Sequence, residues 1–130
     1  MDLMLDTCGL LSLAGLVKKR LSKNTLNRIA VADTVYISAC SLFEIAIKHK
    51  KGGIDLGVFS DARQLWYKAI DEYDLTELPI TGNAFYQSVT LPDWHADPFD
   101  RIIVAQAASE NLSLITFDDL FSSYGITVIS

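Results

Sequence analysis

Residues 35–50 read VYISACSLFEIAIKHK, and this stretch predicts a β-strand that turns directly into a helix. Residues 34–38 are rich in β-forming side chains, whereas residues 41–50 show the apolar spacing of a helix. The same succession recurs along the chain, and no tight hairpin turn joins the β-rich runs. This alternation predicts βαβ units, and hence a mostly parallel sheet of about five strands with helices on both faces.

The remaining predicted elements fill the chain without a linker, repeat or low-complexity segment. We therefore expect one domain over residues 1–130, folded as a three-layer α/β/α sandwich. The other strands are expected at residues 3–6, 77–80, 112–116 and 126–129, and the other helices at residues 9–17, 22–32, 61–72, 82–89 and 98–110.

The composition excludes several classes of protein. Half of the residues are apolar and 21% are charged, which is globular composition rather than that of a disordered chain. No apolar run reaches the roughly 20 residues that span a bilayer, and the opening MDLMLD lacks the basic region of a signal peptide. We expect a cytoplasmic protein without a membrane segment. Cys8 and Cys40 have no metal-binding spacing, so we expect two free thiols.

The charges are unevenly distributed. A net charge of −5 argues against broad electrostatic binding of nucleic acid, which depends on Lys and Arg. Basic residues nevertheless cluster at residues 18–20 and at Lys48, Lys50 and Lys51, and none follows Arg101. These clusters are either solvated faces or a basic rim around an acidic centre. In the second case Lys48, Lys50, Lys51 and Arg101 are the candidate substrate-binding residues.

Four acids lie inside or beside apolar runs, where an isolated carboxylate is unfavourable. Asp6 ends the first predicted strand, Glu44 lies in the helix after the second, and Asp118 follows the fourth. Asp100 opens a helix. In parallel α/β sheets ligands bind at the carboxyl ends of the strands, so we expect these acids to share one edge of the sheet.

The repulsion among clustered carboxylates must be offset by another interaction. Two carboxylates about 5 Å apart repel by about 3 kcal/mol at an effective dielectric of 20, whereas a helix N-terminus contributes only about 0.3–1 kcal/mol. Two explanations fit. Either some acids bind protons with a raised pKa, or a divalent cation lies among them, and an all-oxygen ligand set suits Mg²⁺ or Mn²⁺.

Each acid also has a purely structural explanation. Ser41 and Glu44 have the spacing of a capping box, and Lys48 lies one turn further on as an ion-pair partner. Asp97 precedes Pro98 as a helix N-cap, with Arg101 placed to pair with it. The acids that follow strands could be ordinary turn residues. The coincidence of four acids at one edge favours a shared site over four separate caps.

Three stretches resemble a known family. They are LMLDTCGLLSL at residues 3–13, VYISACSLFEIAIKHKKGGI at residues 35–54 and LPDWHADPFDRIIVAQAASENLSLITFDDLFSSYG at residues 91–125. Their order and spacing are similar to those of PIN domains, specifically the VapC-like toxins of bacterial type II toxin–antitoxin pairs. The resemblance implies a PIN fold, a Mg²⁺- or Mn²⁺-dependent endoribonuclease, an RNA substrate, a cognate antitoxin and a homodimer.

The resemblance also implies roles for individual residues. The family's four catalytic acids fall on Asp6, Glu44, Asp100 and Asp118, and a further acid of this subgroup falls on Asp97. Asp6, Asp100 and Asp118 are the expected metal ligands. Glu44, directly or through water, and Asp97 are further candidate ligands.

Several neighbours of these acids are of interest. The hydroxyls of Thr7 and Thr116 could orient ligating carboxylates, or could serve ordinary turn chemistry. Cys8 stands where family members carry a polar residue, and we expect it to pack as a small apolar side chain. Trp94 and His95 could stack on an unpaired base, although surface packing is the simpler expectation. The alternative function is a catalytically inactive PIN-like domain that acts by binding a protein partner.

Overall fold

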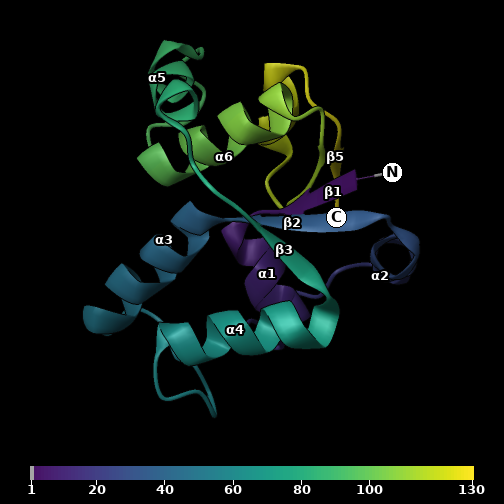
Figure 1. Ribbon diagram of the computed structural model, residues 1–130, viewed down its shortest axis with the longest axis vertical. Helices are drawn as coiled ribbons and strands as arrows, with labels where there is room; N and C mark the ends of the chain where they lie inside the picture. Colours follow the sequence, from purple (N-terminus) through teal and green to yellow (C-terminus); the bar gives the residue numbers. More distant parts are fainter. Residues whose placement is uncertain (1) are drawn as a thin grey trace.

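The computed structural model describes residues 2–130 and shows one five-stranded sheet in the order β3-β2-β1-β4-β5 (Figure 1). Every neighbouring pair of strands is parallel, which confirms the predicted parallel α/β architecture. The strands are β1 (Asp2–Leu5), β2 (Thr34–Ser38), β3 (Leu75–Leu78), β4 (Ser113–Ile115) and β5 (Val128–Ile129). The helices are α1 (Thr7–Leu13), α2 (Lys23–Val31), α3 (Ala39–Lys50), α4 (Ala62–Tyr73), α5 (Gly82–Thr90), α6 (Pro98–Ser109) and the 3₁₀ helix η1 (Asp119–Tyr124).

Side chains of the central strand β1 point alternately into two cores. Leu3 and Leu5 pack in one core with Trp66 of α4, whereas Met4 packs in the other with Ile103 of α6 and Leu114 of β4. Figure 1 shows the matching layers, with α1 and α4 on one side of the sheet and α5 and α6 on the other. Helices therefore cover both faces of the sheet, as a three-layer sandwich requires.

The position of β1 determines where a site can form. Leu5, its last residue, pairs with Ile37 of β2 on one side and with Ile115 of β4 on the other. The amide of Asp6 extends the second pairing by donating to the carbonyl of Ile115 at 3.1 Å. The residues that follow β1, β2 and β4 consequently meet at one edge of the sheet.

The start of α3 differs from the prediction. Ser38 is the N-cap, and its Oγ accepts a hydrogen bond from the amide of Cys40 at 3.1 Å. Ser41 is instead buried inside the helix, with its Oγ 2.9 Å from Oγ1 of Thr7. The predicted capping box between Ser41 and Glu44 is therefore wrong, because the helix begins one turn earlier.

Other boundaries differ as well. α1 spans Thr7–Leu13 rather than residues 9–17, and β5 begins at Val128 rather than at residue 126. Asp74 adopts a left-handed conformation with φ of 53°, which ends α4 and lets β3 begin at Leu75, two residues before the predicted start. Residues 119–124 form η1, in a segment for which no helix or strand was predicted. Cys8 and Cys40 are free thiols, as predicted. Within residues 2–130, no helix has the length and apolar character needed to cross a membrane.

Candidate metal and active site

Five acids gather at the carboxyl edge of the sheet. The N-cap acids are Asp6 for α1, Asp97 for α6 and Asp118 for η1, whereas Glu44 and Asp100 lie within α3 and α6. Each of them lies near enough to another acid for its charge to act on it. The carboxylates of Glu44 and Asp118 raise the pKa of Asp6, and those of Asp97, Glu44 and Asp6 raise the pKa of Asp100.

Asp6 is held by hydrogen bonds at both of its carboxylate oxygens. Its side chain is buried, and both oxygens accept short hydrogen bonds: Oδ1 from the amide of Gly9 and Oδ2 from the hydroxyl of Thr116, each at 2.6 Å. Burial raises the pKa of Asp6 to about 6, although these two hydrogen bonds oppose the shift. A Cβ at position 9 would lie 2.9 Å from the carbonyl oxygen of Ile115, so the close contact requires glycine.

Glu44 lies in the second turn of α3 and is only 4% exposed. The hydroxyl of Thr7 donates to Oε1 at 2.6 Å, and Nζ of Lys48 contacts Oε2 at 2.6 Å. The ion pair expected from the i,i+4 spacing is thus present, whereas the capping role is not. The hydrogen bond to Glu44 raises the pKa of Lys48. Glu44 is a buried carboxylate with one cationic neighbour.

Asp97 and Asp100 lie three residues apart but differ in their partners. Oδ1 of Asp97 accepts a hydrogen bond from the amide of Phe99 at 2.8 Å, which is the predicted N-cap interaction. Asp100 is partly buried, and no hydrogen bond to its carboxylate occurs within residues 2–130. Burial, followed by the charge of Asp97, raises the pKa of Asp100 to about 6. Asp100 is therefore the carboxylate with the least internal compensation.

Asp118 is an exposed acid, with 47% of its side chain accessible. Oδ1 accepts from the amide of Leu120 at 3.0 Å, and Oδ2 lies 2.8 Å from Nε2 of His95. Slight burial acts to raise the pKa of Asp118, but these two hydrogen bonds outweigh it and the pKa is lowered. Thr116 links this acid to Asp6, because its hydroxyl donates to Asp6 and accepts from the amide of Asp118 at 3.1 Å.

His95 is the residue whose place the sequence did not indicate. Surface packing or base stacking was expected, but the residue is buried, and its ring stacks on Phe121 with centroids 4.3 Å apart. Its ring nitrogens contact Asp118 and Tyr124. These partners lie more than 20 residues away in the sequence, and no spacing rule connects them.

Arg101 also differs from expectation. It does not pair with Asp97; its nearest carboxylate is the exposed Asp93, at 3.5 Å. The side chain is only 11% exposed, and each of its five N–H donors meets a backbone carbonyl. The accepting carbonyls belong to Ser88, Val89, Leu91, Pro92 and His95. Arg101 thus caps the end of α5 and fixes the following loop.

The remaining candidate residues lie around the acids. Cys8 is exposed, so the expectation that it packs as an apolar side chain is wrong. Partial burial, and then the charge of Asp6, raise the pKa of its thiol. Lys50 and Lys51 are exposed at the C-terminal end of α3, and Trp94 is about half exposed.

The chemistry of these side chains fits a hard divalent cation, because all the candidate donors are oxygens. As the side chains lie, however, residues 2–130 contain no group of three or more His, Cys, Asp or Glu residues close enough to hold a metal ion. Asp6 and Glu44 are fixed by hydrogen bonds, whereas Asp100 has none and Asp118 is exposed. The cluster therefore offers suitable donors but not a closed coordination site.

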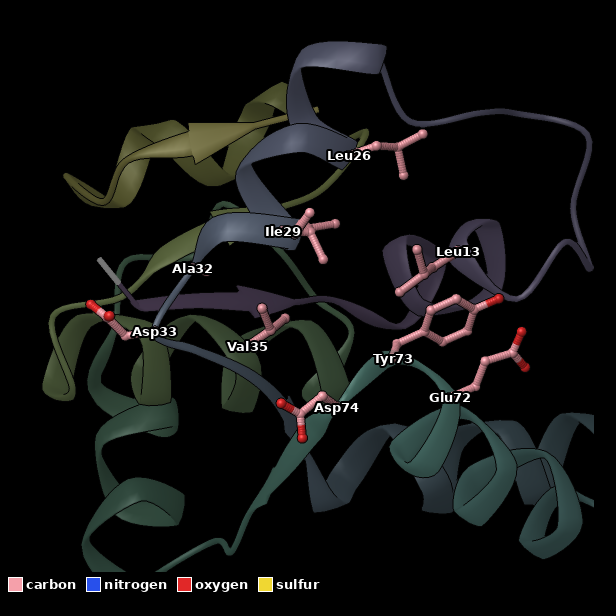
Figure 2. Close-up of a pocket in the computed structure, with 10 residues that line it drawn as sticks. Leu13, Leu26, Ile29, Ala32, Asp33, Val35, Glu72, Tyr73 and Asp74 are labelled. Atoms are coloured by element: carbon pink, nitrogen blue, oxygen red, sulfur yellow. The ribbon is translucent and has the colours of Figure 1, made fainter.

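A separate hollow of about 410 Å³ lies between α1, α2 and α4 (Figure 2). Leu13, Leu26 and Ile29 form part of its apolar lining, and Glu72 and Asp74 contribute carboxylates. None of the five acids described above lines this hollow. It is thus distinct from the candidate metal site.

Comparisons with known proteins identify the fold. No curated protein matches the chain. A toxin–antitoxin complex from Klebsiella pneumoniae contains a chain of similar structure, with a TM-score of 0.66 at 22% identity over 98% of this chain and 96% of that one. VapBC2 from Rickettsia felis, bound to a DNA fragment from its promoter, gives a TM-score of 0.65 at 18% identity over 98% and 97% of the two chains. VapBC-5 from Mycobacterium tuberculosis gives a TM-score of 0.58 at 22% identity over 98% of this chain and 97% of that one. The family model for the PIN domain matches residues 3–126, and the chain therefore belongs to the PIN domain family.

Proposed function

We propose that this chain is a Mg²⁺- or Mn²⁺-dependent endoribonuclease and the toxin of a toxin–antitoxin pair. The supporting observation is that Asp6, Glu44, Asp100 and Asp118 reach one edge of a parallel sheet from four separate elements of a PIN domain. Burial, and then the charges of neighbouring carboxylates, raise the pKa values of Asp6 and Asp100, which supports a site built to receive positive charge.

Different residues of the chain would bind the metal and orient its ligands. Asp6, Asp100 and Asp118 are the proposed metal ligands, with Glu44 and Asp97 as further ligands directly or through water. A bound Mg²⁺ or Mn²⁺ would supply charge neutralisation for the phosphate and a more acidic water. On the protein side, the hydroxyl of Thr116 fixes the direction of the Asp6 carboxylate.

The same role falls to Thr7, whose hydroxyl fixes Glu44. For the substrate, Lys48, Lys50 and Lys51 offer positive charge along the C-terminal half of α3. We leave Arg101 out of this set, since all of its N–H groups already meet carbonyls.

The direct test is incubation of the purified, partner-free chain with RNA. We expect cleavage in Mg²⁺ or Mn²⁺ and none when a chelator removes the metal, because the carboxylates alone would repel the phosphate. Mapping the cut ends identifies the bond that is broken, and DNA of the same sequence is the control substrate. Cleavage that persists in chelator would refute the proposed site. A folded chain that cuts no RNA with any metal would support the inactive, partner-binding alternative.

We also propose that a cognate antitoxin binds this chain, and that the chain forms a homodimer. The similar structures are a toxin–antitoxin complex from Klebsiella pneumoniae and a member of the VapBC family of toxin–antitoxin systems from Mycobacterium tuberculosis, which supports such a partner. The hollow of Figure 2 has an apolar lining and carboxylates, and so suits an apolar segment that carries basic residues. Sedimentation of the isolated chain measures the oligomeric state.

A variant at the hollow tests the antitoxin surface. Leu26 is 42% exposed, so Leu26→Lys adds to the hollow a positive charge that repels a basic segment, with little effect on folding. We expect it to weaken binding of the cognate antitoxin by about tenfold or more, as measured by calorimetry, and to leave RNA cleavage by the free chain unchanged. Val58→Lys, at a 93% exposed position away from the hollow, is the matched control. Equal affinities for both variants would place the antitoxin elsewhere.

A further inference from the structure

His95 lies in a loop, but neighbouring residues contact both of its ring nitrogens and the face of its ring. The residue is 8% exposed, and its ring stacks on Phe121 at an interplanar angle of 23°. Nδ1 lies 2.9 Å from the hydroxyl oxygen of Tyr124, and Nε2 lies 2.8 Å from Oδ2 of Asp118. A buried imidazole with both nitrogens engaged has one orientation and little freedom to leave it.

The hydrogen bonds define the direction of donation. An ionised carboxylate only accepts hydrogen bonds, so Nε2 of His95 carries the proton that lies between it and Asp118. The hydroxyl oxygen of Tyr124 accepts from the backbone amide of His95 at 2.9 Å and also lies within hydrogen-bond distance of Nδ1. Tyr124 therefore holds the ring on the side opposite Asp118.

Arg101 fixes the backbone at the same point. One of its Nη1 hydrogen bonds, at 3.0 Å, goes to the carbonyl of His95, and the others hold the preceding loop and the end of α5. Arg101 follows Asp100 in α6. The chain thus connects the helix that carries Asp100 to the carboxylate of Asp118 through Arg101 and His95.

This connection matters because Asp118 is less enclosed than Asp6 and Glu44. Asp6 and Glu44 are buried and each receives a threonine hydroxyl, whereas the side chain of Asp118 is 47% exposed. An exposed carboxylate samples several rotamers, and ordering it upon metal binding has an entropic cost. We infer that His95 is a positioning residue that holds the carboxylate of Asp118 ready to receive a divalent cation. This inference rests on the proposed function, because it needs Asp118 to be a metal ligand.

Binding of Mn²⁺ to the RNA-free chain, followed by electron paramagnetic resonance, tests the inference without relying on activity. We expect His95→Ala to weaken Mn²⁺ affinity by about tenfold or more, the usual effect of removing a partner of a metal ligand. His95→Gln should recover most of the affinity, because its amide can also donate to Asp118. Tyr124→Phe should weaken affinity by a smaller factor. His49→Gln changes the other histidine of the chain, in the last turn of α3, and should bind Mn²⁺ like the wild type.

Kinetics give a second readout. Because His95 lies behind Asp118 rather than on the substrate, the His95→Ala variant should keep its KM for RNA, and excess Mn²⁺ should restore its kcat. A change in KM alone would overturn the inference in favour of base stacking.

If the wild type binds Mn²⁺ and cuts RNA while His95→Ala and Tyr124→Phe bind the metal equally well, the positioning role is wrong and the nuclease proposal stands. A wild type that neither binds Mn²⁺ nor cuts RNA would overturn both. If circular dichroism shows that His95→Ala does not fold, the Mn²⁺ affinities of His95→Gln and Tyr124→Phe test the inference instead.

Discussion

Replacing Asp6 by Asn should lower RNA cleavage by about 10³-fold or more, the scale of losing a principal electrostatic group of an active site. Asp6 follows the central strand, and its pKa is raised by burial and by the nearby carboxylates of Glu44 and Asp118. An amide keeps the size and one acceptor oxygen, but it cannot offer a charged ligand to a cation. Single-turnover cleavage at saturating Mg²⁺ measures the loss.

The same variant should be more stable than the wild type in metal-free buffer at neutral pH. Burial raises the pKa of Asp6 from an ordinary 3.8 to about 6, so the folded chain binds this proton more tightly than the unfolded chain. The resulting stabilisation is complete below about pH 4 and is lost as the pH rises through about 6. A shift of this size corresponds to on the order of 1–3 kcal/mol. Urea unfolding in chelator at acidic and neutral pH should show this decline for the wild type and a weaker one for Asp6→Asn.

The control for Asp6→Asn is Asp71→Asn, at an exposed position of α4 that is remote from the acids in the sequence. It should change neither cleavage nor the pH dependence of stability. A fully active Asp6→Asn protein would exclude Asp6 from the catalytic set. An Asp6→Asn protein that loses activity and stability together would instead identify Asp6 as a structural cap of α1.

Replacing Arg101 by Ala should reduce the free energy of unfolding by about 3–5 kcal/mol, the range for breaking a largely buried network of charged hydrogen bonds. Its guanidinium joins α6 to the end of α5 and to the loop that carries His95. The side chain is only 11% exposed, so water cannot readily replace these contacts. Urea unfolding in chelator measures the change.

Two variants separate this structural role from a general effect of charge. Arg101→Lys keeps the charge but not the planar fork of five donors, and it should recover only a minor part of the stability. Arg63→Ala removes an exposed arginine of α4 and should change stability by no more than about 0.5 kcal/mol. If Arg101→Ala is as stable as the wild type but binds RNA more weakly, Arg101 is the substrate contact that the sequence suggested.

The sequence predicted the fold well where local pattern and tertiary packing agree. The strand at Thr34–Ser38 has the predicted bounds, because its β-branched and aromatic residues also face the two cores. The predicted start of α3 at Ser41 was wrong because serine is a good N-cap residue, and both Ser38 and Ser41 could serve. In the structure Ser38 makes the N-cap hydrogen bond, and Ser41 instead contacts Thr7, which is distant in the sequence.

The candidate site was predictable in outline for a similar reason. The ends of parallel strands meet at one edge, so the positions of Asp6 and Asp118 follow from the strand pattern. The partners of these acids do not, because side-chain direction depends on packing between distant segments. His95 and Arg101 illustrate this limit. Both carry polar groups that suggested contact with RNA, and the fold uses both to hold its own backbone and side chains.

The central place of β1 also has a consequence for the timing of protein synthesis. Asp6 is translated well before the residue that orients it, because the hydroxyl that donates to its carboxylate belongs to Thr116, 110 residues later. A nascent chain on the ribosome cannot pair β1 with β4 until that strand has left the exit tunnel. Truncated chains and unfinished chains therefore lack the assembled acids. The complete site can therefore form only after β4 and Thr116 have been translated, however early its first acid is made.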